Sequence, residues 1–244
     1  MKLPTCTACA TAVLLVGTAA CAGARLSSDT ANDVRHSAVT VGFYNIDRQI
    51  EYEEEVFNGA YIAARRKVSR FGDLWDVDND LGAIFAEALR RLGLQTRGPE
   101  QHGAGARNAA YRHLCTEQWI PNEGWRALAL PESHRAVLRA QGSRYLILWC
   151  STWFGTKVSP PQRVATIFLP GSVFIYDVTS GVPIFTENVN LNIHADFEHS
   201  IREIERDGLS PLRRATAYSL ISETFGKLSQ ALQVPPEQRM TMNR

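Results

Sequence analysis

The sequence lacks an excess of charge of either sign. Of its 244 residues, 26 are Lys or Arg and 25 are Asp or Glu. A nucleic-acid-binding protein normally carries a basic excess that neutralises phosphates. Short arginine clusters do occur at 64–67, 89–91 and 212–214, but on helices such clusters are usually solvated faces. We therefore expect no nucleic-acid partner.

Long hydrophobic runs are also missing. The apolar run near the N-terminus, Ala10–Val16, is far shorter than the ~20 residues that a membrane-spanning helix needs, and no other stretch replaces it. Lys2 precedes this run, and the small residues Thr18–Ala20 follow it. A positive charge, a short apolar core and a small-residue cleavage site are typical of an export signal. We predict that residues 1–20 are a signal peptide.

The motifs of common catalytic sites are absent. The sequence contains no G-x-S-x-G, and no serine is placed in a strand–turn–helix elbow. The glycine-rich segment 103–107 follows no predicted strand and opens no apolar helix, so it does not fit a phosphate-binding loop. No carboxylate stands alone in an apolar segment that would raise its pKa. We expect no catalytic residue, no cofactor and no enzymatic activity.

Two acidic segments resemble metal sites, but neither has the required spacing. The first places acids at positions 1, 3, 5 and 12 of a calcium loop, but Leu81 stands where the loop needs glycine. The second places its histidines five residues apart, whereas a zinc-binding helix spaces them by four. We interpret Asp196 as a helix N-cap and the first set as acids at a helix N-terminus. The two sets are Asp76, Asp78, Asp80 and Glu87, and His194, Asp196, Glu198 and His199.

The segment "TAAC" at 18–21 resembles the lipobox of bacterial lipoproteins. In that family the cysteine after the cut receives diacylglycerol on its sulfur, which implies a lipid anchor at Cys21. The usual pattern has leucine where this chain has Thr18, and the alternative is ordinary cleavage near Ala20 or Ala22 with Cys21 incidental. In enteric bacteria an aspartate directly after the cysteine retains such proteins at the inner membrane, and this chain has Ala22 at that position. The resemblance therefore implies the outer membrane, with the protein facing the periplasm.

Cysteines are scarce, and their number is informative. Of the five, Cys6 and Cys9 leave with the signal, and acylation would use Cys21. Cys115 and Cys150 remain, and an even pair in an oxidising compartment favours a disulfide. Such a bridge would stabilise the fold by about 3–4 kcal/mol in the chain-entropy model. Alternatively, Cys150 is a small buried hydrophobe at the end of a strand.

Hydrophobic periodicity predicts one α/β domain of the three-layer α+β type, a mixed sheet with amphipathic helices packed on it, over residues 37–232. Residues 21–36 are small, polar and aperiodic, which predicts a lipidated N-terminus and a flexible tether. We predict a disordered tail over residues 233–244. Two segments are less regular: 46–75 fit either a helix or an excursion carrying a strand, and 95–125 predict a long irregular loop. The expected strands are 38–45, 145–150, 164–177 and 181–193, and the expected helices are 81–92, 131–142, 196–207 and 210–232.

Tryptophans are the remaining candidates for a binding site. Trp119 and Trp125 belong to the 95–125 segment, and Trp149 and Trp153 flank the end of a predicted strand. Buried core aromatics are the simplest interpretation. The alternative is an exposed aromatic rim, formed by Trp119, Trp125 and Trp153, around a groove for a small ligand, a glycan or a partner.

The layout of the domain resembles a group of periplasmic proteins. A helix ending in "LRRLGL" precedes "VLRAQGSRYLILW", which is followed by "VFIYDVTSGVPIF" and a closing amphipathic helix. This order is similar to the α/β domains of the lipoprotein activators of penicillin-binding proteins, the curli-secretion lipoprotein and the TolB N-terminal domain. Asp177, Ser180 and Gly181 match the group's D-x-x-[ST]-G turn, whereas Arg144 stands where the group often has aspartate. The resemblance implies a non-enzymatic adaptor or assembly factor that binds an envelope protein.

Overall fold

The computed structural model describes residues 25–46, 50–58, 61–68, 76–97, 104–121, 123–152, 154–159, 164–196 and 210–235. Its helices are α1 (Ser28–His36), α2 (Val77–Arg91), α3 (Ala104–Gln118), α4 (Glu132–Ala140) and α6 (Ser210–Ala231). The strands of the main sheet are β1 (Ala38–Asn45), β2 (Ile50–Asn58), β3 (Tyr61–Val68), β4 (Gln95–Arg97), β7 (Tyr145–Ser151), β8 (Phe154–Ser159), β9 (Val164–Asp177) and β10 (Pro183–Asp196). A separate two-stranded ribbon consists of β5 (Trp119–Ile120) and β6 (Gly124–Trp125).

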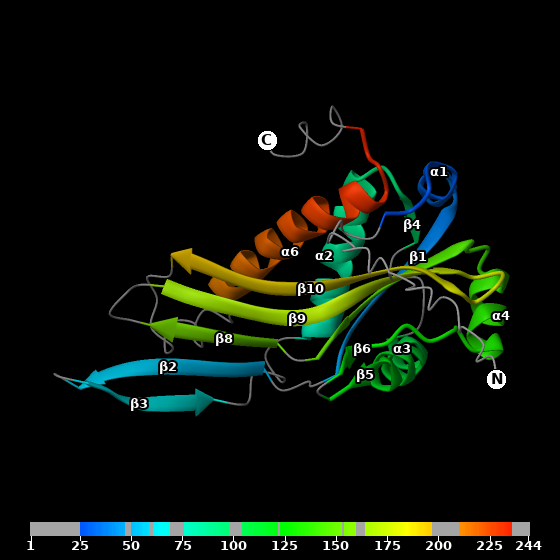
Figure 1. The fold of residues 1–244 in the computed structure, drawn as a ribbon. Helices are drawn as coiled ribbons and strands as arrows, with labels where there is room; N and C mark the ends of the chain where they lie inside the picture. Colours follow the sequence, from blue (N-terminus) through cyan, green and yellow to red (C-terminus); the bar gives the residue numbers. More distant parts are fainter. Residues whose placement is uncertain are drawn as a thin grey trace, which may run out of the picture.

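The main sheet is mixed and has the order β3-β2-β8-β9-β7-β1-β4, with β10 paired to β9. Strand β9 organises it: β8 pairs with its first part, β7 pairs with its second part, and β10 runs along its other edge. The β2–β3 hairpin and helix α1 consequently lie at opposite ends of the sheet (Figure 1). Helices cover both faces, so the α/β class expected from the sequence is confirmed.

Side-chain alternation along the central strands divides the core into two layers. Successive residues of a strand point to opposite faces of the sheet. On β7, one set packs with α1, α2 and α6, and the other packs with α3 and α4. Because all seven β7 residues are buried, this strand reads as a continuous apolar run. The two sets are Tyr145, Ile147 and Trp149, and Leu146, Leu148 and Cys150.

The strongest helix signals of the sequence are confirmed. In α2, Leu81, Phe85 and Leu89 are buried on one stripe, and the Asp76 carboxylate caps the helix by accepting the Asn79 backbone N–H at 3.2 Å. Helix α4 follows Pro131. Gly142, just beyond it, has a φ of +71°, a conformation that glycine adopts without strain.

The loop predicted for 95–125 is wrong for most of that segment, because 104–118 form helix α3 and 95–97, 119–120 and 124–125 form strands. Its buried residues Tyr111, Leu114, Cys115 and Gln118 recur at the spacing of one helix face. The Tyr111 ring packs so closely on β1 that a Cβ atom on Gly42 would lie 2.8 Å from a ring carbon. Tertiary packing of this kind contributes most of the stability of helices in proteins.

Segment 46–75 contains strands, so the helix alternative for it is wrong. Strands β2 and β3 form an antiparallel hairpin, and β2 continues the sheet by pairing in parallel with β8. The hairpin register sets the acidic positions 53–55 opposite the basic positions 65–67.

The flexible tether predicted through residue 36 is wrong for its second half, because 28–36 form α1. Ser27 caps this helix by accepting the Thr30 backbone N–H at 3.2 Å. Leu26, Ala31 and Val34 are buried in the larger core layer. At the other end of the chain, Val234 is also buried. The domain therefore extends beyond the predicted limits of 37 and 232; residues 1–24 and 236–244 lie outside the described part of the chain.

Strand β10 alternates as the sequence predicts, with Val189 buried between the exposed Asn188 and Asn190. The strand continues to Asp196. Because an N-cap residue itself has an extended backbone, the interpretation of Asp196 as a helix N-cap stays a prediction. The helix predicted over 196–207 otherwise lies outside the described residues. Helix α6 begins at Ser210 as expected, and its Lys227 ammonium donates to the Asn188 carbonyl oxygen at 2.8 Å.

Candidate functional site

The Cys115–Cys150 disulfide predicted as one of two alternatives is present. It joins α3 to β7, with 5.3 Å between the two Cα atoms, and both residues are fully buried. Cys150 therefore ends its strand as half of a bridge and also fills part of the smaller core layer. The bridge attaches α3 covalently to the centre of the sheet.

Two of the candidate tryptophans form a pair. Trp119 and Trp125 face each other across the β5–β6 ribbon, with tilted rings whose centroids are 5.2 Å apart. Both are half-buried, and Trp125 also packs against Phe174 of the sheet. Trp149 is a core residue in contact with Phe43 and Phe85. Trp153 lies outside the described residues, as does Cys21.

The turn between β9 and β10 is built by the D-x-x-[ST]-G residues. The Asp177 carboxylate accepts the backbone N–H of Thr179 at 2.7 Å and of Ser180 at 3.4 Å. The Ser180 hydroxyl accepts the Val182 backbone N–H at 3.2 Å, and Gly181 has a φ of +76°. An Asx turn uses aspartate because its carboxylate accepts nearby backbone N–H groups, and it uses glycine because glycine adopts a positive φ without steric cost. The hairpin turn predicted here is confirmed, and the motif has a structural role.

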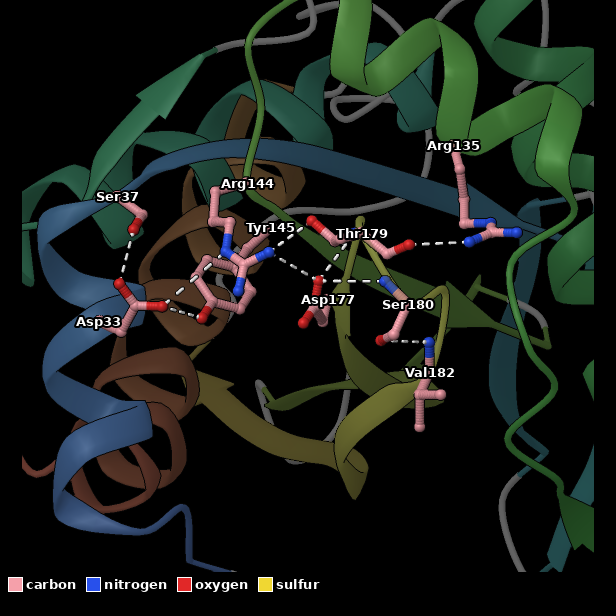
Figure 2. A network of polar contacts seen from close by, with 9 residues as sticks. All are labelled: Asp33, Ser37, Arg135, Arg144, Tyr145, Asp177, Thr179, Ser180 and Val182. Atoms are coloured by element: carbon pink, nitrogen blue, oxygen red, sulfur yellow. Dashed lines mark hydrogen bonds and ion pairs between the residues drawn. The ribbon is translucent and has the colours of Figure 1, made fainter.

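Arg144 connects this turn to helix α1 (Figure 2). Its guanidinium donates to the Asp177 carboxylate at 3.2 Å and to the Thr179 hydroxyl, and it lies 3.9 Å from the Asp33 carboxylate. The position at which Arg144 departs from the family pattern is therefore the centre of a polar network that joins three segments of the chain.

Asp33 of α1 also accepts a hydrogen bond from the Tyr145 hydroxyl (Figure 2). This hydrogen bond lowers the pKa of the Asp33 carboxyl, with smaller help from Ser37 and Arg144. Burial, followed by the bond to Asp33, raises the pKa of Tyr145 to about 12. At neutral pH the protonated Tyr145 hydroxyl therefore donates a hydrogen bond and the ionised Asp33 carboxylate accepts it.

Helix α4 is fastened to the other side of the same turn. The Arg135 guanidinium donates to the Thr179 carbonyl oxygen at 2.8 Å (Figure 2), and the Leu130 backbone N–H donates to the Gly181 carbonyl oxygen at 2.8 Å. Glu132 pairs with Arg139 and Arg135, and its hydrogen bond with Arg139 is the main reason that the pKa of its carboxyl is lowered. The network holds α1, α4 and the hairpin turn together.

The two ends of the described chain are bound to each other. The Gln233 amide donates to the Leu26 carbonyl oxygen at 2.8 Å and accepts from the Ser28 hydroxyl at 3.0 Å. Gln233 has a φ of +50°, which is uncommon for a residue other than glycine. Its backbone geometry aims the side chain at the start of α1.

The acids considered as a calcium loop have separate structural roles. Asp76 caps α2, the Asp78 carboxylate accepts the Asn45 backbone N–H at 3.0 Å, and Glu87 pairs with arginines of its own helix. Asp80 lies 3.7 Å from Arg213 of α6. Within the described residues, no group of three or more His, Cys, Asp or Glu is arranged to hold a metal. Residues 198 and 199 of the second candidate set lie outside that part of the chain.

Several residues that organise the structure have no local signal in the sequence. Asp33 lies in the segment predicted as a tether, and Gln233 lies in the predicted tail. Gln118 is buried on α3 and accepts a hydrogen bond from the Tyr176 hydroxyl at 2.7 Å. Burial raises the pKa of Tyr176, so this phenol is a hydrogen-bond donor at physiological pH. The i, i+3, i+4, i+7 spacing of 111, 114, 115 and 118 is the one signal that would have placed Gln118 on a buried helix face.

Among the helices of the described residues, none has the length and apolar character needed to cross a bilayer.

No protein-family model matches this sequence, and no curated protein matches it. Among solved structures, the chain is similar to a PelC dodecamer from Paraburkholderia phytofirmans, at 14% identity and a TM-score of 0.40, covering 83% of this chain and 91% of that one. It is similar to the lipoprotein GNA1162 from Neisseria meningitidis, at 12% identity and a TM-score of 0.36, covering 75% and 99%. It is also similar to the LpoB C-terminal domain from Salmonella enterica, at 10% identity and a TM-score of 0.25, covering 69% and 96%. These are distant similarities, and the fold described above rests on the sheet and helices of this chain alone.

Proposed function

We propose that this protein is a lipoprotein of the bacterial cell envelope, cleaved after residue 20 and anchored through Cys21 to the outer membrane, facing the periplasm. The observation that carries this proposal is the buried Cys115–Cys150 bridge, because disulfides form and persist in oxidising compartments and are rare in the cytosol. The lipobox-like "TAAC" supplies the anchor. Mature bacterial lipoproteins carry more than one acyl chain, and several chains together make membrane attachment stable.

We further propose that the domain is a non-enzymatic adaptor or assembly factor that binds a protein partner. The ionisable groups of the described network serve as caps, turn formers and ion pairs between segments. An exposed sheet edge is a template for an added strand from another protein. Strand β3 provides such an edge: among the described strands, it pairs with β2 alone.

The anchor is tested by metabolic labelling with a fatty acid. We expect the label on the full chain and its loss in Cys21→Ser, while the signal is still cleaved. Labelling that survives Cys21→Ser would contradict the assignment.

The partner surface is tested by photocrosslinking in intact envelopes. A photoreactive phenylalanine analogue replaces Tyr61, the first residue of β3, or, as a matched control, Tyr218, which is 77% exposed on α6. We expect a discrete protein adduct from position 61 that position 218 does not give. The absence of any adduct specific to position 61 in the lipidated protein would contradict a partner surface on β3.

A second candidate is a module for a small ligand or glycan, favoured by the paired, half-buried rings of Trp119 and Trp125. Aromatic rings with one free face stack on sugars and other flat ligands. Titration with soluble peptidoglycan fragments, followed by intrinsic tryptophan fluorescence, tests this candidate. A saturable change that Trp119→Phe abolishes would support it, and an unchanged spectrum would exclude that ligand class.

A further inference from the structure

We infer that the α1 end of the domain is the surface that rests against the lipid bilayer, and that the β2–β3 hairpin points away from it. The inference rests on the proposed anchor at Cys21 and adds to it an orientation and a contact surface. It depends on three observations: a short connection to the anchor, a rigid attachment of α1, and the position of the hairpin at the far end of the sheet.

The connection between the anchor and the folded domain is short. Five peptide units separate Cys21 from Leu26, and a fully extended chain covers at most ~3.6 Å per residue. The Cα atom of Leu26 therefore lies within about 18 Å of the Cα atom of Cys21. The polar headgroup region of one leaflet is roughly 5–8 Å thick, so even a fully extended connection keeps the start of the domain within about 13 Å of the outer edge of that region.

The start of the domain is also held in place. The Leu26 side chain is buried, and its carbonyl oxygen accepts the Gln233 amide at 2.8 Å. Two residues of α1, Ala31 and Val34, are fully buried in the larger core layer. Asp33 of the same helix binds Tyr145 and lies beside Arg144. Lengthening the connection would require α1 to leave the sheet, which these contacts oppose.

The exposed residues at this end suit a headgroup surface. Between residues 25 and 36, every exposed side chain is polar or charged, and the apolar ones point inward. An interfacial helix that inserts into the acyl region presents an apolar face to the lipid. Helix α1 has its apolar face on the sheet, so the contact is with headgroups and the domain rests on the membrane without insertion. The exposed residues are Arg25, Ser27, Ser28, Asp29, Asn32, Asp33 and His36.

The β2–β3 hairpin lies at the opposite end of the sheet (Figure 1). Strand β9 ends at Asp177, next to the α1 network, and begins at Val164, where it pairs with β8. At ~3.4 Å per residue, its 14 residues separate these two ends by on the order of 40 Å. The register places Glu54 of β2 beside Val158, and Val158 beside Ala165. Since β2 continues to Asn58, the hairpin tip lies beyond the start of β9.

The test uses the full-length acylated protein in vesicles of phosphatidylethanolamine and phosphatidylglycerol that contain a lipid with a nitroxide on its headgroup. A fluorophore is attached through Asp29→Cys on α1 or through Asn58→Cys at the hairpin tip, with the Cys115–Cys150 bridge intact. We expect several-fold stronger quenching at position 29 than at position 58. A Gly/Ser linker of about 20 residues inserted after Gly23 has a mean span of ~25 Å, and we expect it to reduce the quenching at position 29.

Equal quenching at the two positions, or stronger quenching at position 58, would overturn the orientation. Quenching at position 29 that is unchanged by the inserted linker would also overturn it, because the short connection would then not be the cause. Failure of the anchor is a separate result: fatty-acid labelling of the same preparations reports it directly. A protein that is labelled on Cys21 and equally quenched at both positions retains the proposed anchor and loses the orientation.

Discussion

The Gln233 side chain donates a hydrogen bond to the Leu26 carbonyl oxygen, across 207 positions of sequence. A second bond joins the same amide to the Ser28 hydroxyl. The first and last parts of the described chain are therefore fastened together at the base of α1.

We expect Gln233→Ala to destabilise the protein by about 1–2 kcal/mol, since two hydrogen bonds of ~0.5–1.5 kcal/mol each are lost. Urea unfolding of the purified domain measures this. Gln230→Ala is the matched control, because Gln230 is an exposed glutamine three residues earlier, near the end of α6. Gln233→Gly should cost less than Gln233→Ala, because glycine accepts the φ of +50°. Equal stability of the position 233 and position 230 variants would show that the two hydrogen bonds of the Gln233 side chain add nothing to the free energy of unfolding.

The disulfide gives a second prediction. Removing both cysteines, in Cys115→Ala/Cys150→Ala, should lower the unfolding free energy by about 3–4 kcal/mol, the chain-entropy value for a loop of this length. Thermal unfolding with and without a reducing agent checks the cause: reduction should destabilise the parent chain and leave the double variant unchanged. A reductant effect of the same size on both proteins would contradict it.

A third prediction concerns the space above Gly42. In Gly42→Ala the new Cβ would lie 2.8 Å from a Tyr111 ring carbon and 2.9 Å from a Leu148 methyl carbon. Overpacking of this kind costs about 1–3 kcal/mol. Gly226→Ala on α6 is the control, because no atom lies within 4 Å of its Cβ position, and it should stabilise the helix by about 0.5–1 kcal/mol. The same sign for both substitutions would contradict the close packing of α3 on β1.

The Asp33–Tyr145 pair predicts a pH dependence. The pKa of Asp33 is lowered in the folded protein, so its contribution to stability is present above the unfolded value of 3.8 and is lost as the pH falls through the folded value. The pKa of Tyr145 is raised to about 12, so its contribution is complete below the unfolded value of 10 and is lost as the pH rises from there through the folded value of about 12. Tyr145→Phe should reduce the pH dependence of the free energy of unfolding in both the acid and the alkaline range.

The pH dependence is measured by urea unfolding across the acid and alkaline ranges, in a double-mutant cycle of Asp33→Asn and Tyr145→Phe. A favourable coupling energy at neutral pH that disappears at both extremes is the expected result. Additive effects of the two substitutions at every pH would contradict the pairing.

Elements with a strong local signal could be predicted from the sequence. Helix α2 has a complete apolar stripe and a capping aspartate, and β1 and β7 are dense in β-branched and large apolar residues. The Asp177 turn was predictable because its hydrogen bonds connect residues that are neighbours in sequence. The same is true of the Pro131 and Gly142 limits of α4.

What could not be predicted depends on contacts between distant segments. Helix α3 is stable because Tyr111 packs on Gly42 and Cys115 bonds to Cys150, and neither contact leaves a trace in local composition. Helix α1 looks like a linker because only a few of its residues are apolar, and its partners Arg144 and Tyr145 are more than a hundred residues away. The candidate tryptophans were grouped by residue type, yet Trp149 is a core residue while Trp119 and Trp125 pair at the surface.

The Lys227 contact on β10 has a consequence for the behaviour of the protein at high concentration. The Lys227 ammonium group donates a hydrogen bond to the Asn188 carbonyl oxygen and forms ion pairs with Glu187 at 3.4 Å and Glu223 at 3.6 Å. A strand from another molecule that approached this part of β10 would have to displace a charged group from its neighbours. Charges placed at strand edges in this way discourage fibril growth. Among the described strands that have an unpaired edge, β10 is the longest, and this contact protects part of that edge against uncontrolled polymerisation.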